Sequence, residues 1–477
     1  MIYNKKNLIQ YLIALIAMVV LMKVSGGAGF VVMVPFLLMA SFNKKPETLI
    51  FLLIMSIAML IGNNNLMPKG QVFGYAQRIS MLLLSVVMVA QIAGLRACPL
   101  LKPFLSILPY LGWMALSSIL GWCPFISYLK LFLFTMVFFA YYGIANLVSV
   151  SARSDFAKMR SAFLALAIFF ILGSIALIPF PGIAQMGSEE IIAAIRAGDD
   201  IKSLFKGMTF HSQALGPVCA ILGVALLADM VFGIRRPNGL YLILLTCVPF
   251  LIWKTASRTA MGTFVAGIML CMFLTGMSHD LAEGWKRRVL RTLLLGFIGM
   301  LCVILVVPSA RNKVAGFVLK YSRDDAKIEH VTTDDVLRTR RSKWDEGIYN
   351  FKQSPLFGNG FQVSPQMKRL KPSLNVLSAP IEKSIWISAV LEEGGLVGFL
   401  LFLVFFLTVI FSLLKRGAYI GLSVFLGFAI TNLGEFTFFS MSGGGGFFWA
   451  LVFIGICLDA KRIGVEKSPA MWQAWMQ

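Results

Sequence analysis

Charged side chains are scarce in this sequence. They make up 14% of the 477 residues, hydrophobic residues make up 58%, and the mean hydropathy is +0.81, whereas a soluble globular chain carries about 25% charged residues. A soluble globular protein is therefore excluded. Repeated apolar runs near the ~20 residues that cross a bilayer as a helix predict an all-α polytopic membrane protein instead.

Acidic residues are scarcer than basic residues. The chain has 22 Asp and Glu against 43 Lys and Arg, a net charge of +21. Such a surplus can indicate nucleic-acid binding, but membrane proteins also concentrate Lys and Arg in their cytoplasmic loops. The second explanation fits the hydropathy, so we expect the lipid bilayer and no nucleic acid as a partner.

Histidine and cysteine are too few, and too poorly spaced, to form a recognisable metal site. The three histidines (His211, His279 and His330) lack zinc-ligand spacing, and the seven cysteines show no CxxC pair. Adjacent aspartates at 199–200, 324–325 and 334–335 could hold a divalent cation, but such pairs more often cap helices or lie in solvated loops. With no P-loop and no GxSxG either, the sequence predicts no metal, no cofactor and no ATP-driven pump.

Apolar runs separated by polar breaks predict about fourteen spans, or twelve if two of the short early runs do not cross. The runs are 8–22, 27–42, 48–62, 79–95, 103–120, 126–149, 161–179, 212–233, 239–255, 259–277, 289–308, 384–413, 417–437 and 443–460. With the N-terminus inside, every inner connection is basic, from Lys5-Lys6 to Lys461-Arg462, while the opposite connections at 23–26, 121–127 and 438–442 have one Lys between them. The positive-inside rule therefore predicts both termini in the cytoplasm.

Two longer polar segments, 180–210 and 309–383, then fall on the extracytoplasmic side. The second has fourteen Lys and Arg against eight Asp and Glu, and its aromatic residues argue against a disordered tether. We expect a large, partly helical loop, with an amphipathic helix over Thr333–Lys352 near the membrane surface. We predict four parts of the chain: N-terminal spans with the shorter loop (1–208), spans that carry His211 and Arg258 (209–308), the large loop (309–383) and C-terminal spans (384–477).

Polar motifs at two outer span ends are candidates for chemistry. His211 and Gln213 precede Gly216-Pro217, which indicates a shaped helix start. Lys254 and Arg258 lie in a tight turn between two spans, where snorkelling is the structural alternative. The guanidinium of Arg258 suits a bidentate grip on phosphate oxygens.

The large loop and the spans after it contribute further candidates. Arg338, Arg340 and Arg341 shortly precede Trp344, and together with Arg258 they could clamp a diphosphate from both sides. Carboxylates at the edge of a span are functional candidates by default. Those found here are Glu382, Glu393 and Glu435, for which salt bridges to the arginines are the alternative.

The order of five motifs resembles the O-antigen ligase and polymerase superfamily from residue 210 onward. They are Phe210-His-Ser-Gln-Ala-Leu-Gly216, Ser257-Arg-Thr-Ala260, Arg340 before Trp344, Pro355-Leu-Phe-Gly-Asn-Gly-Phe361 and Glu393-Gly-Gly-Leu-Val-Gly398. The resemblance implies a metal-independent glycosyltransferase at the outer face of the bacterial cytoplasmic membrane. Its donor would be an undecaprenyl-diphosphate-linked oligosaccharide and its acceptor a glycan hydroxyl. A chain-length regulator or another polysaccharide-assembly membrane protein is a candidate partner.

By the same resemblance Arg258 and Arg340 would neutralise the diphosphate leaving group, with Arg338 and Arg341 near it. The remaining candidates for substrate binding are Lys254, Gln213, Trp344, Glu393 and Glu435. Many members use a His-Asn pair as the base, but the expected histidine position is Ser384 here, so Glu382 or His211 becomes the candidate base. This departure favours a polymerase of O-antigen or exopolysaccharide repeat units. A ligase, a transporter of lipid-linked oligosaccharides and a scaffold remain the alternatives.

Overall fold

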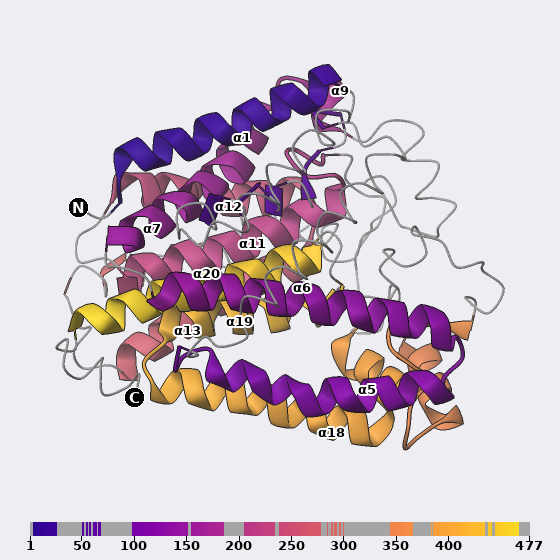
Figure 1. Ribbon diagram of the computed structural model, residues 1–477. Coiled ribbons are helices and arrows are strands. Elements are labelled where there is room, and N and C mark those ends of the chain that lie inside the picture. The colour runs from indigo at the N-terminus through magenta and orange to yellow at the C-terminus, as the bar shows by residue number, and fades with distance from the viewer. Residues whose placement is uncertain are drawn as a thin grey trace.

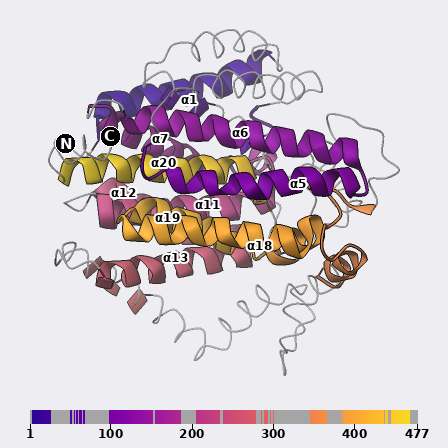
Figure 2. The ribbon, with the colours of Figure 1, turned by 60° about the horizontal axis from the view of Figure 1, so that its bottom comes forward.

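The computed structural model is a bundle of helices that run side by side along a common direction (Figures 1 and 2). It describes residues 3–25, 98–150, 154–185, 205–233, 238–277, 344–365, 383, 385–434, 437–440 and 444–466, with parts of 50–67 and 284–299. The main helices are α1 (Lys5–Ser25), α5 (Leu108–Leu120), α6 (Pro124–Val150), α7 (Ser154–Ala167), α11 (Ser212–Ala228), α12 (Gly239–Lys254), α13 (Arg258–Met277), α18 (Trp386–Lys415), α19 (Tyr419–Thr431) and α20 (Gly444–Glu466).

Several of these helices are extended by tighter or wider turns. A 3-10 helix, η1 (Lys102–Ile107), leads into α5. The π-helical turn η2 (Ile168–Leu172) joins α7 to α8 (Gly173–Ala176), and η3 (Asp229–Gly233) continues α11. The short α9 (Pro181–Ala184) and a helix over 344–353 lie outside the long helices.

The helix lengths confirm an all-α polytopic membrane protein. Seven described helical segments are long and apolar enough to cross a bilayer, and α12, α19 and α20 are shorter apolar helices. Within the described residues there is no strand, only two isolated bridges. The predicted runs at 27–42 and 79–95 and most of 289–308 lie outside the described residues, so the choice between twelve and fourteen spans stays a prediction. The same holds for the four-part division, since most of 309–383 lies outside them too.

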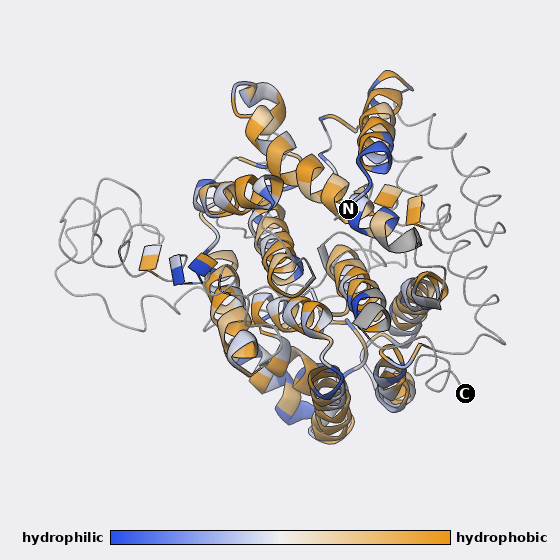
Figure 3. Ribbon diagram, turned by 90° about the vertical axis from the view of Figure 1, so that its left-hand side faces the viewer, coloured by the Kyte–Doolittle hydropathy of each residue, from blue (hydrophilic) through white to orange (hydrophobic). Residues whose placement is uncertain are grey.

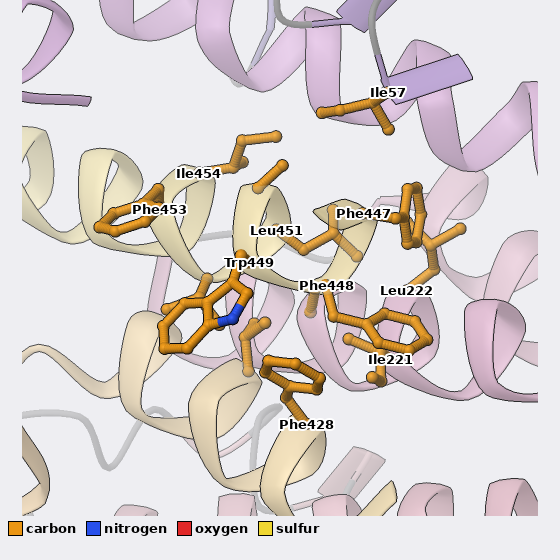
Figure 4. Close-up of a cluster of buried hydrophobic side chains, with 14 of the residues drawn as sticks. Ile57, Ile221, Leu222, Phe428, Phe447, Phe448, Trp449, Leu451, Phe453 and Ile454 are labelled. Carbon is orange, nitrogen blue, oxygen red and sulfur yellow. The ribbon is translucent and has the colours of Figure 1, made fainter. Parts of the chain in front are cut away.

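Helix α11 occupies the centre of the bundle. Its apolar stretch is completely buried, as expected of a helix that is hydrophobic all round. It packs against α12, α13, α19 and α20. The view along the bundle shows the helices nearly end-on, side by side (Figure 3). A core of aromatic rings fills the neighbouring space between α19 and α20 (Figure 4). There the Trp449 indole donates a hydrogen bond to the Phe438 carbonyl (2.7 Å), and the Phe428 ring stacks on Phe438 at 4.7 Å.

The two ends of the bundle hold different parts of the chain. At one end Asn4 bonds to Ser161, Arg160 pairs with Asp229, and Arg462 bonds to the Gly417 carbonyl. At the opposite end, called the site end below, lie the α5–α6 connection, residues 205–211, the α12–α13 turn, residues 344–365 and the start of α18 (Figure 1). All polar motifs singled out in the sequence that the structure describes fall at the site end.

Candidate functional site

The turn over residues 355–361 lies against a break in helix α18. Gly395 has φ +64° and ψ −166°, so the regular hydrogen bonds across this point are interrupted and backbone groups need other partners. The turn supplies them through Asn359 N–H to Glu392 O (2.9 Å), Gly360 N–H to Glu393 O (3.1 Å) and Leu396 N–H to Pro355 O (2.8 Å). Two motifs that are distant in sequence therefore form one unit.

Glycines permit this close approach. A Cβ on Gly358 would lie 2.2 Å from the Glu393 carbonyl oxygen, and a Cβ on Gly395 would lie 2.3 Å from the Leu356 carbonyl oxygen. Both glycines also have a positive φ angle, which residues other than glycine rarely adopt. The glycines of the two motifs are thus explained by backbone packing.

Helices α5 and α6 support the same unit from the N-terminal half of the chain. The Ser117 hydroxyl donates to the Glu393 carbonyl (2.8 Å), and the Trp113 indole donates to the Gly394 carbonyl (2.7 Å). The Trp113 ring also stacks on Phe357 at 5.3 Å. Sequence reasoning missed these residues, because they lie in spans with no polar motif to mark them.

A buried charge cluster lies behind the turn; it consists of Lys383, Glu392, Glu393 and Asn350. The Lys383 ammonium is 3.3 Å from a Glu392 carboxylate oxygen and 3.1 Å from one of Glu393. The Asn350 amide donates to Glu392 (3.2 Å), while the Asn359 amide donates to the Asn350 carbonyl (2.9 Å). Glu393 has no exposed surface, which favours a role in holding the loop to α18.

The cations of this region balance its carboxylates. Burial lowers the pKa of Lys383, but the carboxylates of Glu392 and Glu393 outweigh burial and raise that pKa above its usual value. The two carboxylates thus favour the protonated form of Lys383. Lys130, buried in α6, interacts electrostatically with Glu393 and Lys383, so two cations and two carboxylates share the interior.

His211 begins helix α11, as the sequence indicated. It is the N-cap residue, and its Nδ1 accepts a hydrogen bond from the Gln213 backbone N–H at 3.2 Å. Such caps satisfy a backbone donor at a helix start. The imidazole is half-buried, at a helix N-terminus where negative charge is favoured.

The α12–α13 turn packs directly against this helix start. A Cβ on Gly216 of α11 would lie 2.5 Å from the Ser257 Cβ, so the glycine lets the two segments touch. Ala256 adopts φ +52°, which makes the turn tight. Arg258 is the first residue of α13 and is half-buried, whereas Lys254 ends α12 and is exposed.

The end of α19 joins the two groups of motifs. The Asn432 carbonyl accepts a hydrogen bond from the Trp386 N–H (3.1 Å) at the start of α18. A Cβ on Gly434 would lie 2.0 Å from the Thr259 hydroxyl at the start of α13. Residues 432–434 thus contact both the helix carrying Arg258 and the helix carrying the charge cluster.

The structure describes only part of the predicted site. It places His211 and Gln213 at the start of α11, places Lys254 and Arg258 at the adjoining α12–α13 turn, and places Glu393 in the charge cluster. Trp344 begins the helix over 344–353 and is 38% exposed. The predicted residues outside the described part of the chain are Glu382, Arg338, Arg340, Arg341 and Glu435. Among described residues, Glu393 pairs with Lys383, and a salt bridge to the arginines of the large loop stays a prediction.

Residues 240–403 match the family model described as O-Antigen ligase. The chain carries an O-antigen ligase domain. This domain covers α12, α13, the 355–361 turn and the break in α18, which confirms the resemblance found from the motifs. His211 and the helices α5 and α6 lie outside the matched segment. A search of curated proteins found no significant match.

The groups at the start of α11 and in the α12–α13 turn that could bind a substrate are cationic side chains, helix N-termini and hydroxyls. Arg258 at the N-terminus of α13, beside the N-terminus of α11, forms an arrangement that favours phosphate oxygens. Within the described residues no three His, Cys, Asp or Glu side chains gather as a metal site would require. The metal-independent mechanism stays a prediction.

Proposed function

We propose that this O-antigen ligase domain protein is a glycosyltransferase that polymerises undecaprenyl-diphosphate-linked repeat units at the outer face of the bacterial cytoplasmic membrane. The observation that carries the proposal is Arg258 at the N-terminus of α13, packed beside the start of α11. A diphosphate leaving group gains negative charge in the transition state, and fixed cations and backbone dipoles stabilise that charge most effectively. Arg340, from the large loop, would complete the grip.

The acceptor hydroxyl needs a base, for which we propose Glu382, with His211 as the second candidate. Glu382 directly precedes Lys383 in the sequence, and Lys383 belongs to the charge cluster. Lys383 itself is held as a cation by two carboxylates, which argues against its acting as the base. The charge cluster would then fix the position of Glu382 relative to the membrane.

Substitution of Arg258 tests the proposal. We expect Arg258→Ala to abolish surface glycan chains and Arg258→Lys to restore them only partly, because a lysine cannot grip two phosphate oxygens in a planar fork. Lys415→Ala is the matched control, since it removes an exposed cation at the opposite end of α18. All variants are compared by membrane protein level and by gel analysis of glycans. Normal glycans from Arg258→Ala, and from Arg340→Ala tested likewise, would refute the proposal.

Gel analysis also separates the polymerase from the ligase. Loss of long chains with single repeats retained indicates a polymerase, whereas accumulation of lipid-linked polymer beside unmodified acceptor indicates a ligase. A transporter would be expected to carry charged residues deep in several spans, and Lys130 is a buried cation of α6. Lys130 interacts with Glu393 and Lys383, so it is explained as part of a neutral interior.

A further inference from the structure

Helix α18 is longer than a membrane is thick. Its 30 residues extend about 45 Å at ~1.5 Å per residue, whereas the hydrocarbon core of a bilayer is about 30 Å thick. Lys415 and Arg416 mark one boundary, because such side chains extend to the lipid headgroups. Counting back the ~20 residues that cross the core reaches Gly395, where the helix breaks.

Side-chain exposure along α18 indicates the same boundary. None of residues 386–395, all of which the structure describes, is exposed. The large exposed apolar side chains begin at Leu396 and continue through Leu400, Val404, Leu407 and Phe411. The part of α18 after Gly395 therefore faces acyl chains, and the part before it lies in the headgroup layer, covered by protein.

The helix over 344–353 is part of that cover. A Cβ on its Gly347 would lie 3.4 Å from the Ser388 Cβ, and its Asn350 bonds to Glu392. The following turn meets Leu396 through the Pro355 carbonyl. In Figure 2 this orange helix is seen nearly end-on beside the start of α18, which runs across the view. The segment thus lies across α18 at the depth of the headgroups.

The exposed side chains of this segment are of mixed chemistry, and Asp345, Tyr349 and Lys352 point away from the protein between the two flanks of the helix. At 100° per residue, Trp344 and Ile348 lie on one flank of the helix and Glu346 and Gln353 on the other, with Gly347 and Asn350 between them against the protein. Trp344 is 38% exposed and Ile348 is 36% exposed. In the turn, Leu356 and Phe357 are also exposed large apolar residues. They adjoin Leu396, the first residue of the lipid-facing stripe of α18.

We infer that residues 344–357 form a membrane-interface element, with Trp344 and Ile348 among the phospholipid headgroups and Leu356 and Phe357 at the edge of the acyl chains. Tryptophan at the headgroup level and apolar residues just below it are the pattern of interfacial anchors. The occupant of this surface is the bilayer, because the surface is continuous with the lipid-facing side of α18. The inference depends on the membrane fold and not on the proposed activity.

Site-specific photo-crosslinking in lipid tests this placement. The full chain, with benzoylphenylalanine at one position, is reconstituted into vesicles of phosphatidylethanolamine and phosphatidylglycerol, irradiated and analysed by mass spectrometry for lipid adducts. The test positions are Ile348 and Phe357. Val404 is the positive control on the lipid-facing stripe, and Glu346 is the matched negative control on the opposite flank of the same helix.

We expect lipid adducts at Phe357 in a yield comparable to that at Val404, a lower but clear yield at Ile348, and background at Glu346. Absence of adducts at both Ile348 and Phe357 while Val404 reacts would overturn the inference. Equal yields at Ile348 and Glu346 would overturn the assigned orientation of the helix. Cross-links to a second copy of the chain in place of lipid would show that a protein covers the surface.

Discussion

Removal of the Lys383 ammonium leaves two adjacent carboxylates in the interior. The ammonium is 3.1 Å from Glu393, and at an effective dielectric constant of about 20 this distance gives an attraction of about 5 kcal/mol. Loss of one partner from a buried ion pair costs about 3–5 kcal/mol in proteins. We therefore expect Lys383→Met to lower the free energy of unfolding by about 3–5 kcal/mol.

A second substitution should recover part of that loss. Lys383→Met combined with Glu393→Gln removes one charge of each sign, so the net charge of the cluster is the same as in the wild type. Residues in direct contact couple by about 0.5–3 kcal/mol. We expect the double variant to be more stable than the sum of the two single effects predicts, by at least about 1 kcal/mol.

Stability is measured at pH 7 by reversible unfolding of the purified protein in mixed micelles with increasing SDS, followed by circular dichroism. Lys415→Met is the control, because an exposed lysine outside the cluster contributes within about 0.5 kcal/mol. If the effects of Lys383→Met and Glu393→Gln on the free energy of unfolding are additive, the proposed balance of charges is refuted. A Lys383→Met loss no larger than that of the control would refute the buried ion pair itself.

Three further outcomes follow from the same contacts. The pKa of Lys383 is raised, so its stabilisation is complete below the unfolded-state value of about 10.4 and is lost as pH rises through the higher folded-state value. The stability that the Lys383 charge contributes should therefore be lost only in strong alkali, measured as a narrowing difference between wild type and Lys383→Met. Gly395→Ala forces a Cβ to 2.3 Å from the Leu356 carbonyl at positive φ and should cost on the order of 2–3 kcal/mol in SDS unfolding, whereas Gly112→Ala, with open space around it, should cost nothing. His211→Asn keeps an N-cap and should preserve thermal stability; if it also preserves glycan synthesis in cells, His211 has no chemical role.

Hydropathy made most of the described fold predictable from sequence. The predicted runs at 212–233, 239–255, 259–277 and 443–460 start within two residues of α11, α12, α13 and α20, because burial in lipid imposes long apolar runs with polar ends. The run predicted to 437 ends at Thr431 instead. There the Asn432 side chain bonds to the Phe428 carbonyl and to the Thr437 N–H and ends the helix.

Contacts between distant segments could not be predicted from the sequence. The motifs Pro355–Phe361 and Glu393–Gly398 were found separately, but nothing in either predicts that one caps a break in the helix of the other. Glu393 was recognised as a costly carboxylate. Its partner was not, because Lys383 is one of many lysines in a basic loop and only the fold brings it to 3.1 Å.

The break in α18 joins two requirements at one point. It exposes backbone groups that the 355–361 turn must satisfy, and it lies where the lipid-facing stripe begins, so the turn is held at a fixed depth in the membrane. Residues 432–434 then connect the start of α18 to the start of α13 through Trp386 and Thr259. The positions of the 355–361 turn and of Arg258 are therefore linked by one continuous set of contacts. A distortion at Gly395 should consequently disturb the Arg258 side of the site as well as the loop.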